Sequence, residues 1–138
     1  MARWSLPMKS YVDRTKGNLN AAVRACALEI TAKIIVRSPV DTGRFRGNWM
    51  IDCDVTPTGF DWDKTDPDGG AALAEATGKL AAYTLGDRIR LRNNLPYSVA
   101  LEYGHSDQAP QGMVRVTLVE FGAITGRAAR KARRGQAG

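Results

Sequence analysis

Side chains that could act as a nucleophile, a base or a metal ligand are few in this sequence, and they are scattered along it. A catalytic site requires such groups to converge on one point. The one histidine, His105, follows Gly104 in a segment with the composition of a loop. A histidine in that position could act as a general base, but it is more often a surface or interface residue.

The triplet Asp41-Thr42-Gly43 is also the one that aspartic proteases use. Their chemistry needs two aspartates that share a proton, contributed by two lobes or by two subunits. In this chain the triplet occurs once, directly after a proline that ends a predicted helix. The surrounding residues also lack the lysine of a Walker-type phosphate-binding loop. We therefore expect no catalytic residue in this segment.

An aspartate-rich loop could bind calcium, but its spacing does not fit the known pattern. A helix–loop–helix calcium site has glycine at its sixth position and glutamate at its twelfth. Counted from Asp61, these positions hold Asp66 and Ala72. Cys26 and Cys53 lie outside any Cys-x-x-Cys or Cys/His cluster, so we expect small buried apolar residues, with a disulfide as the weaker alternative. The sequence predicts neither a metal nor a cofactor.

Basic residues are concentrated near the C-terminus. The 138-residue chain has a formal net charge of +6, and five positive charges without any acid follow residue 126, which leaves about +1 for the remainder. We therefore expect one domain, residues 1–126, and a flexible basic tail, residues 127–138. The tail could contact nucleic-acid phosphates, although a solvated terminus explains it equally well. Its candidate contact residues are Arg127, Arg130, Lys131, Arg133 and Arg134.

The composition is that of a soluble domain, with 43% hydrophobic and 25% charged residues. The first residues contain no long apolar run, and no stretch approaches the roughly 20 apolar residues of a membrane span. We expect neither a signal peptide nor a membrane contact.

Hydrophobic periodicity predicts a long amphipathic helix over residues 13–37, ended by Ser38-Pro39. Its apolar stripe consists of Leu19, Val23, Cys26, Ile30 and Ile34. Further along, the patterns predict strands at 48–56 and 87–95, helices at 71–83 and 112–134, and a helical turn near 96–106. This order is typical of an α+β fold, in which a small sheet packs against the long N-terminal helix and a C-terminal helix leads into the basic tail.

Two segments about fifty residues apart carry motifs that belong together in one family. Residues 38–49 read SPVDTGRFRGNW, and residues 96–121 begin PYSVALEYGHS. The chain resembles the tail-completion and tail-component proteins of long-tailed bacteriophages, the group that includes the lambda-type protein Z. The matching positions are Pro39, Val40, Asp41, Thr42, Gly43, Phe45 and Arg46, then Pro96, Tyr97, Leu101, Glu102, Tyr103 and Gly104.

This resemblance implies a structural virion protein of the tail or neck, assembled in the host cytoplasm, with no catalytic residues. It would form a ring of copies of itself, hexameric by family resemblance, at the head-proximal end of the tail. Its other partners would be tail-tube and head–tail connector proteins and, transiently, DNA in the lumen. The alternative is a nucleic-acid-binding accessory protein that acts through the basic tail.

The residues of the first motif suit a tight turn. Pro39 stops the helix, Asp41 and Thr42 can hydrogen-bond the backbone of the turn, and Gly43 can adopt a positive φ. We expect Arg44 and Arg46 to remain accessible.

Charged and aromatic residues elsewhere are candidates for contacts between subunits. Arg44 and Arg46 could meet Glu102 of the same or the next subunit. The loop 57–70 carries two aromatic rings, which either reach a neighbour or fold back onto their own core. The complete candidate interface is Arg44, Arg46, Phe60, Trp62, Arg88, Arg90, Arg92, Glu102 and His105.

Overall fold

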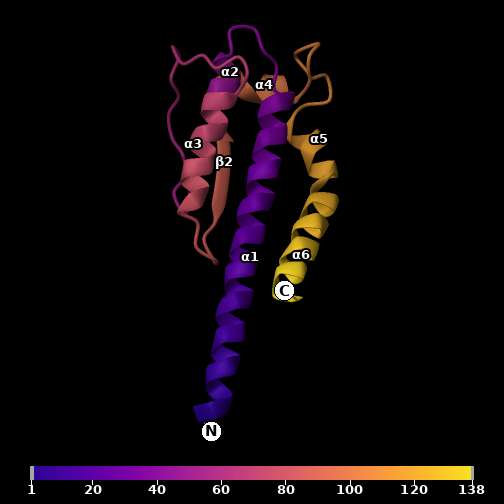
Figure 1. Ribbon diagram of the computed structural model, residues 1–138. Coiled ribbons are helices and arrows are strands. Elements are labelled where there is room, and N and C mark those ends of the chain that lie inside the picture. Colours follow the sequence, from indigo (N-terminus) through magenta and orange to yellow (C-terminus); the bar gives the residue numbers. More distant parts are fainter. Residues whose placement is uncertain (1, 138) are drawn as a thin grey trace.

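The computed structural model describes residues 2–137, and the side chains of residues 17–134. One long helix, α1 (Ala2–Arg37), runs through the molecule. A two-stranded sheet and helix α3 (Gly70–Ala81) lie on one side of α1, and helix α6 (Phe121–Ala137) lies along the other side (Figure 1). The predicted α+β class, with a small sheet against a long N-terminal helix and a C-terminal helix, is confirmed.

Helix α1 ends at Arg37, as the sequence predicts, but it begins eleven residues before the predicted start at residue 13. Gly17 lies inside this helix. A glycine inside a helix costs about 1 kcal/mol, which the neighbouring turns can offset. At the other end, the Ser38 hydroxyl donates to the Ile34 carbonyl at 2.7 Å. This bond and Pro39 stop the helix there.

The sheet consists of β1 (Trp49–Cys53) and β2 (Ile89–Asn93), which are antiparallel with Ile51 opposite Leu91. Both strands are shorter than predicted. β1 cannot continue because Asp54 has a positive φ of 62°, which is incompatible with a strand. Trp49 and Ile51 are buried, but Cys53 is only half-buried and Val55, beyond the strand, is 58% exposed, so apolar residues alternate inward only over the first part of the predicted strand.

The remaining helices are short, and two of them differ from the sequence prediction. Helix α2 (Arg44–Gly47) was not predicted, because four residues carry no readable periodicity. Helix α4 (Ser98–Glu102) matches the predicted helical turn. The helix predicted over 112–134 is two helices, α5 (Val114–Val119) and α6, separated at Glu120.

The segment predicted to be a flexible tail is instead helical as far as Ala137. Small residues explain this, because Ala128 and Ala132 of α6 line a shallow hollow together with alanines of α1. Arg127 also pairs with Glu29 of α1 at 3.1 Å. The basic residues therefore lie on an ordered helix rather than on a free chain end.

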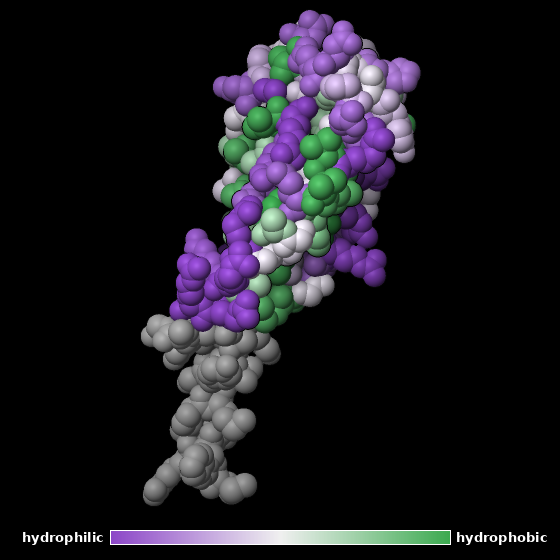
Figure 2. Space-filling view, turned by 90° about the vertical axis from the view of Figure 1, so that its right-hand side faces the viewer, coloured by the Kyte–Doolittle hydropathy of each residue, from purple (hydrophilic) through white to green (hydrophobic). Residues whose placement is uncertain are grey.

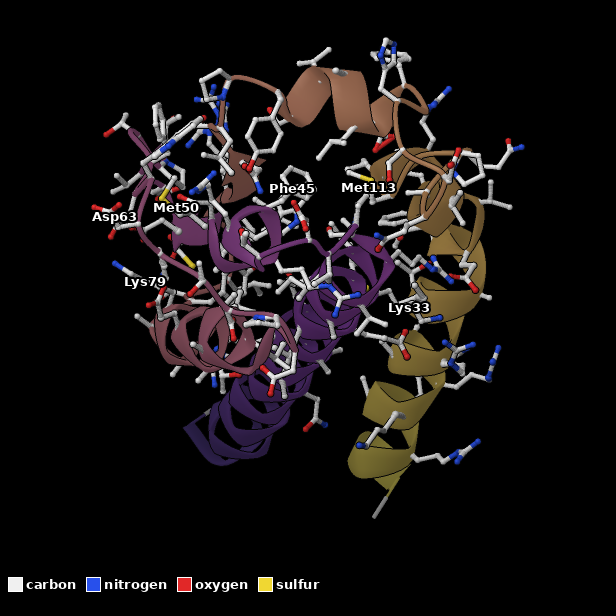
Figure 3. The ribbon with its side chains drawn as sticks, turned by 90° about the horizontal axis from the view of Figure 1, so that it is seen from above. Lys33, Phe45, Met50, Asp63, Lys79 and Met113 are labelled. Carbon is white, nitrogen blue, oxygen red and sulfur yellow. The ribbon has the colours of Figure 1, made fainter. Side chains whose placement is uncertain are left out.

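The main core lies where the C-terminal end of α1 meets α2, β1 and the segments around α4 and α5. Phe45 and Met113 belong to this core cluster together with Ile34 and Ile35 of α1 (Figure 3). The rings of Phe45 and Trp49 meet edge-on with centroids 5.6 Å apart. Full burial of a side chain of this size stabilises the fold by about 1.5–3 kcal/mol. Cys26 and Cys53 are free thiols, so they form no disulfide. Both are only half-buried, whereas the sequence predicts buried apolar residues.

Candidate functional site: the junction of the two motifs

The two motif segments, far apart in the sequence, meet in the folded chain. Residues 39–45 and residues from 97 to 108 line one hollow of about 350 Å³. Gln108 joins its two walls, because the Val40 N–H donates to Gln108 Oε1 at 2.8 Å and Gln108 Nε2 donates to the Val40 carbonyl at 2.9 Å. The junction is therefore held by specific hydrogen bonds.

Gly43 allows the turn to form. Its φ is +89°, the left-handed conformation that the sequence predicts. A Cβ atom at this position would lie 2.5 Å from the backbone nitrogen of Pro67. Thr42 Oγ1 accepts the Arg44 N–H at 3.3 Å, as expected for a turn residue. The hydrogen bond predicted for Asp41 is not formed within the described residues, and Asp41 is exposed.

Within the chain, the two arginines of the turn do not meet Glu102. Arg46 donates to three main-chain carbonyls, those of Val36 at 2.7 Å, Ser38 at 3.0 Å and Pro67 at 2.9 Å. These hydrogen bonds satisfy carbonyl groups at the C-terminal end of α1. Those carbonyls receive no helical N–H donor, because Pro39 stops the helix. Arg44 donates through Nε to the Trp62 carbonyl at 2.5 Å, and its guanidinium lies 4.6 Å from the centre of the Trp62 ring.

Glu102 belongs to the fold rather than to an accessible interface. Its Oε1 accepts the N–H groups of Met113 at 3.0 Å and Val114 at 2.7 Å, where α5 begins. Its Oε2 accepts the Arg115 N–H and Nε, each at 3.2 Å. The side chain is 17% exposed. Burial alone would raise the pKa of this carboxyl, but the three backbone donors and the guanidinium outweigh burial and lower the pKa below its ordinary value.

His105 lies at the rim of the hollow and is exposed. Its N–H donates to the Ala100 carbonyl at 3.1 Å, just after Gly104, whose φ of +91° ends α4 as predicted. In the part of the chain with described side chains, the imidazole forms no hydrogen bond, and no cluster of three potential metal ligands is found. The hollow can thus receive a polar group of a partner, but it lacks a hydrogen-bonded acid–base pair.

The two aromatic rings of the loop 57–70 are only partly exposed, so they neither reach far into solvent nor fold fully into the core. Phe60 and Trp62 are each 47% exposed. The Trp62 ring lies edge-on against Tyr97, with centroids 6.2 Å apart. Val99 of α4 and Tyr103, which follows α4, are 66% and 65% exposed, and the Arg115 guanidinium lies 4.8 Å from the centre of the Tyr103 ring. The exposed apolar side chains on and around α4, namely Phe60, Trp62, Val99 and Tyr103, are called here the α4 surface.

The other basic candidates lie away from the junction. Arg88, Arg90 and Arg92 belong to the solvent-facing side of β2 and its approach, with Arg90 opposite Asp52 of β1. Figure 2 shows the side of the molecule that carries α5 and α6, where hydrophobic patches alternate with hydrophilic ridges. Four basic residues of α6 form no ion pair with the described side chains. These are Arg130, Lys131, Arg133 and Arg134.

Comparison with protein-family models, with curated proteins and with solved structures found no match to this chain. Among the described residues, no helix is long and apolar enough to span a membrane.

Proposed function

We propose that this chain is a structural virion protein of a tailed phage, which forms a ring at the neck or head-proximal end of the tail and enables head–tail joining. The observation that supports this proposal most is the junction itself. The two segments that resemble the tail-completion family fold against each other and are joined through Gln108 and Val40. The two motif segments, which are separate in the sequence, thus form one structural unit.

The use of the motif residues also favours a structural role. Gly43 permits a close backbone approach, Arg46 binds three carbonyls, and Glu102 binds the start of α5. Each of these roles holds chain segments in place. Polar residues are exposed at the junction itself, but the α4 surface beside it is aromatic and aliphatic, which is typical of a site that another protein covers.

A closed ring needs two different surfaces on each subunit, because its contacts run head to tail. The α4 surface is our candidate for the first. The second is the outer side around the α5–α6 break, where Leu118, Val119 and Phe121 are 55%, 85% and 49% exposed. The basic residues of α6 then remain available to face the DNA in the lumen or solvent.

The deciding experiment is to locate the protein in the assembled particle. Purified virions, examined by cryo-electron microscopy with a tagged copy of the chain, should carry several copies around the tail axis at the neck. Absence from virions, or a single copy away from the axis, would exclude the ring. Tails assembled with Tyr103→Ser should fail to join heads. Val55→Ser provides a control, because Val55 is also an exposed apolar residue, 58% exposed, but follows β1 and lies outside the α4 surface.

The alternative function, nucleic-acid binding through the C-terminal region, is favoured by one observation. The basic residues lie on an ordered helix, and only Arg127 among them pairs with an acid of the described part. Salt-dependent DNA binding that disappears when residues 127–138 are deleted, together with absence from virions, would favour this alternative.

A further inference from the structure

One edge of the sheet is open, and the register shows which groups it presents. The Asp54 N–H donates to the Arg88 carbonyl at 2.7 Å, so these two residues form a hydrogen-bonded pair. In an antiparallel pair such residues alternate with non-bonded ones. Arg90 and Arg92 therefore direct their N–H and carbonyl groups toward β1, whereas Ile89 and Leu91 direct theirs away from it. In the described residues, no group pairs with these outward groups of Ile89 and Leu91.

An apolar groove of about 410 Å³ lies beside this edge. Its floor is α1, with Cys26 and Ile30 among the lining residues, and its far wall is α6, through Phe121 and Thr125. The side chains of Ile89 and Leu91 form the near wall. A strand added to β2 would place every second side chain into this groove, as in known cases of strand addition to a sheet edge.

The other edge of the sheet, along β1, is partly protected. The outward Cys53 N–H is bound by Asp52 Oδ1 at 2.8 Å, and the Cys53 thiol donates to the Lys79 carbonyl of α3 at 3.8 Å. The loop that follows β1 and helix α3 line the same side of the strand. Proteins often block sheet edges in this way to prevent pairing with other chains. The main-chain groups of Ile51 have no hydrogen-bond partner among the described residues, so the two edges differ in the loop and helix beside β1 and the apolar groove beside β2.

Charge limits what can pair with β2. Arg88, Arg90 and Arg92 lie on its outer side, and none forms an ion pair with a described side chain. Symmetric pairing of β2 with the β2 strand of a second copy would place these arginines together, which is unfavourable for directly opposed like charges. β1 already shows the complementary pattern, with Ile51 toward α1 and Asp52 opposite Arg90.

We propose that the β2 edge and the adjoining groove accept an extended segment of another protein, in which apolar residues alternate with aspartate or glutamate. The main-chain groups of Ile89 and Leu91 bind the segment, its apolar residues enter the groove over α1, and its acids lie beside the arginines. This proposal does not depend on the virion role.

The test uses the full chain and a synthetic peptide with the sequence of residues 48–56 carrying Cys53→Ser, which has the required alternation. Amide hydrogen exchange is followed by NMR at millimolar peptide. The exchange of Ile89 and Leu91 should slow by about tenfold or more, whereas Arg90, already bound to β1, should change much less. A control peptide exchanges the positions of Ile51 and Asp52, so that an acid faces the groove, and should have no effect.

A pair of protein variants tests the groove itself. Thr125→Trp should fill it and abolish the peptide effect. Thr77→Trp is the matched control, because both threonines lie on helices and donate to the carbonyl four residues earlier, at 2.9 Å in each case, but only Thr125 lines the groove.

Three results would overturn the proposal. The first is unchanged exchange at Ile89 and Leu91, and the second is equal slowing by both peptides. The third is slowing that appears without peptide as the protein concentration rises, because the occupant would then be a second copy of this chain.

Discussion

Glu102→Gln is the most informative single substitution, because it keeps the shape of the side chain and removes its charge. In the native structure Glu102 Oε1 accepts two backbone N–H groups at the start of α5. A hydrogen bond to a charged group contributes about 1.5–3 kcal/mol and a neutral one about 0.5–1.5 kcal/mol, so each bond weakens by about 1 kcal/mol. At Oε2 the Arg115 N–H, a third backbone donor, loses its acceptor because the glutamine NH2 group only donates, whereas the ion pair with the half-exposed Arg115 side chain adds little. We expect a loss of at least about 2 kcal/mol in the free energy of unfolding at neutral pH.

The same substitution should have a pH-dependent cost, with a sign set by the lowered pKa of Glu102. A carboxyl whose pKa is lower in the folded state contributes its full stabilisation above the unfolded pKa, about 4.3 for glutamate. That stabilisation decreases as the pH falls below this value, and it is lost once the pH has fallen through the folded pKa. The difference between wild type and Glu102→Gln should therefore shrink in acid.

Urea unfolding of both proteins, followed by circular dichroism at neutral pH and at successive acidic pH values, measures this difference. Glu75→Gln is the matched control, since Glu75 is 59% exposed and its pair with Lys64 is a surface ion pair worth less than about 1 kcal/mol. A Glu102→Gln cost that is no larger than that of the control, or that stays constant down to acidic pH, would refute the role assigned to Glu102.

Four further variants test other parts of the fold and surface. Gly43→Ala should lower the free energy of unfolding by more than about 2 kcal/mol, because strain at positive φ adds to a clash with the backbone. Gly59→Ala is the control and should cost about 1 kcal/mol, because Gly59 has a positive φ but open space around it. Equal melting temperatures of the two variants would contradict this prediction. Arg46→Lys should cost about 1–2 kcal/mol in urea unfolding, since an ammonium cannot bind the same three carbonyls, and an unchanged midpoint would show that they bind water equally well. Trp62→Ala should lower stability by only about 1 kcal/mol but prevent head–tail joining in a tail-assembly assay, and normal joining would remove this loop from the interface. Neutralising the unpaired basic residues of α6 should leave the melting temperature unchanged and, if DNA is bound, reduce the salt dependence of binding by about 3–4 in the log–log slope, as filter binding would measure. The residues to change to glutamine are Arg130, Lys131, Arg133 and Arg134.

Features of the sequence that repeat over several residues predict the fold well. The stop of α1 at Pro39 is confirmed, and the apolar stripe of α1 and the alternation of β1 are correct in part, since Ile34, Trp49 and Ile51 are buried but Leu19 and Val55 are 44% and 58% exposed. The positive φ of Gly43 was also predictable, because a turn residue followed by a sharp reversal favours glycine. Features shorter than two helical turns were not predictable. Helix α2 and the break at Glu120 depend on packing against α1, which a single sequence does not reveal.

The candidate site shows why charged residues were placed less accurately than apolar ones. Arg46 and Glu102 were expected at an interface because charges near a motif suggest a partner, yet both bind main-chain groups of their own fold. The reason lies in the many helix ends of this small domain. Helices α2, α4 and α5 have four to six residues each, too few to be stable alone, so their terminal N–H and carbonyl groups need partners from elsewhere in the chain. Long charged side chains meet that need, and the surface left for partners is the apolar one around α4.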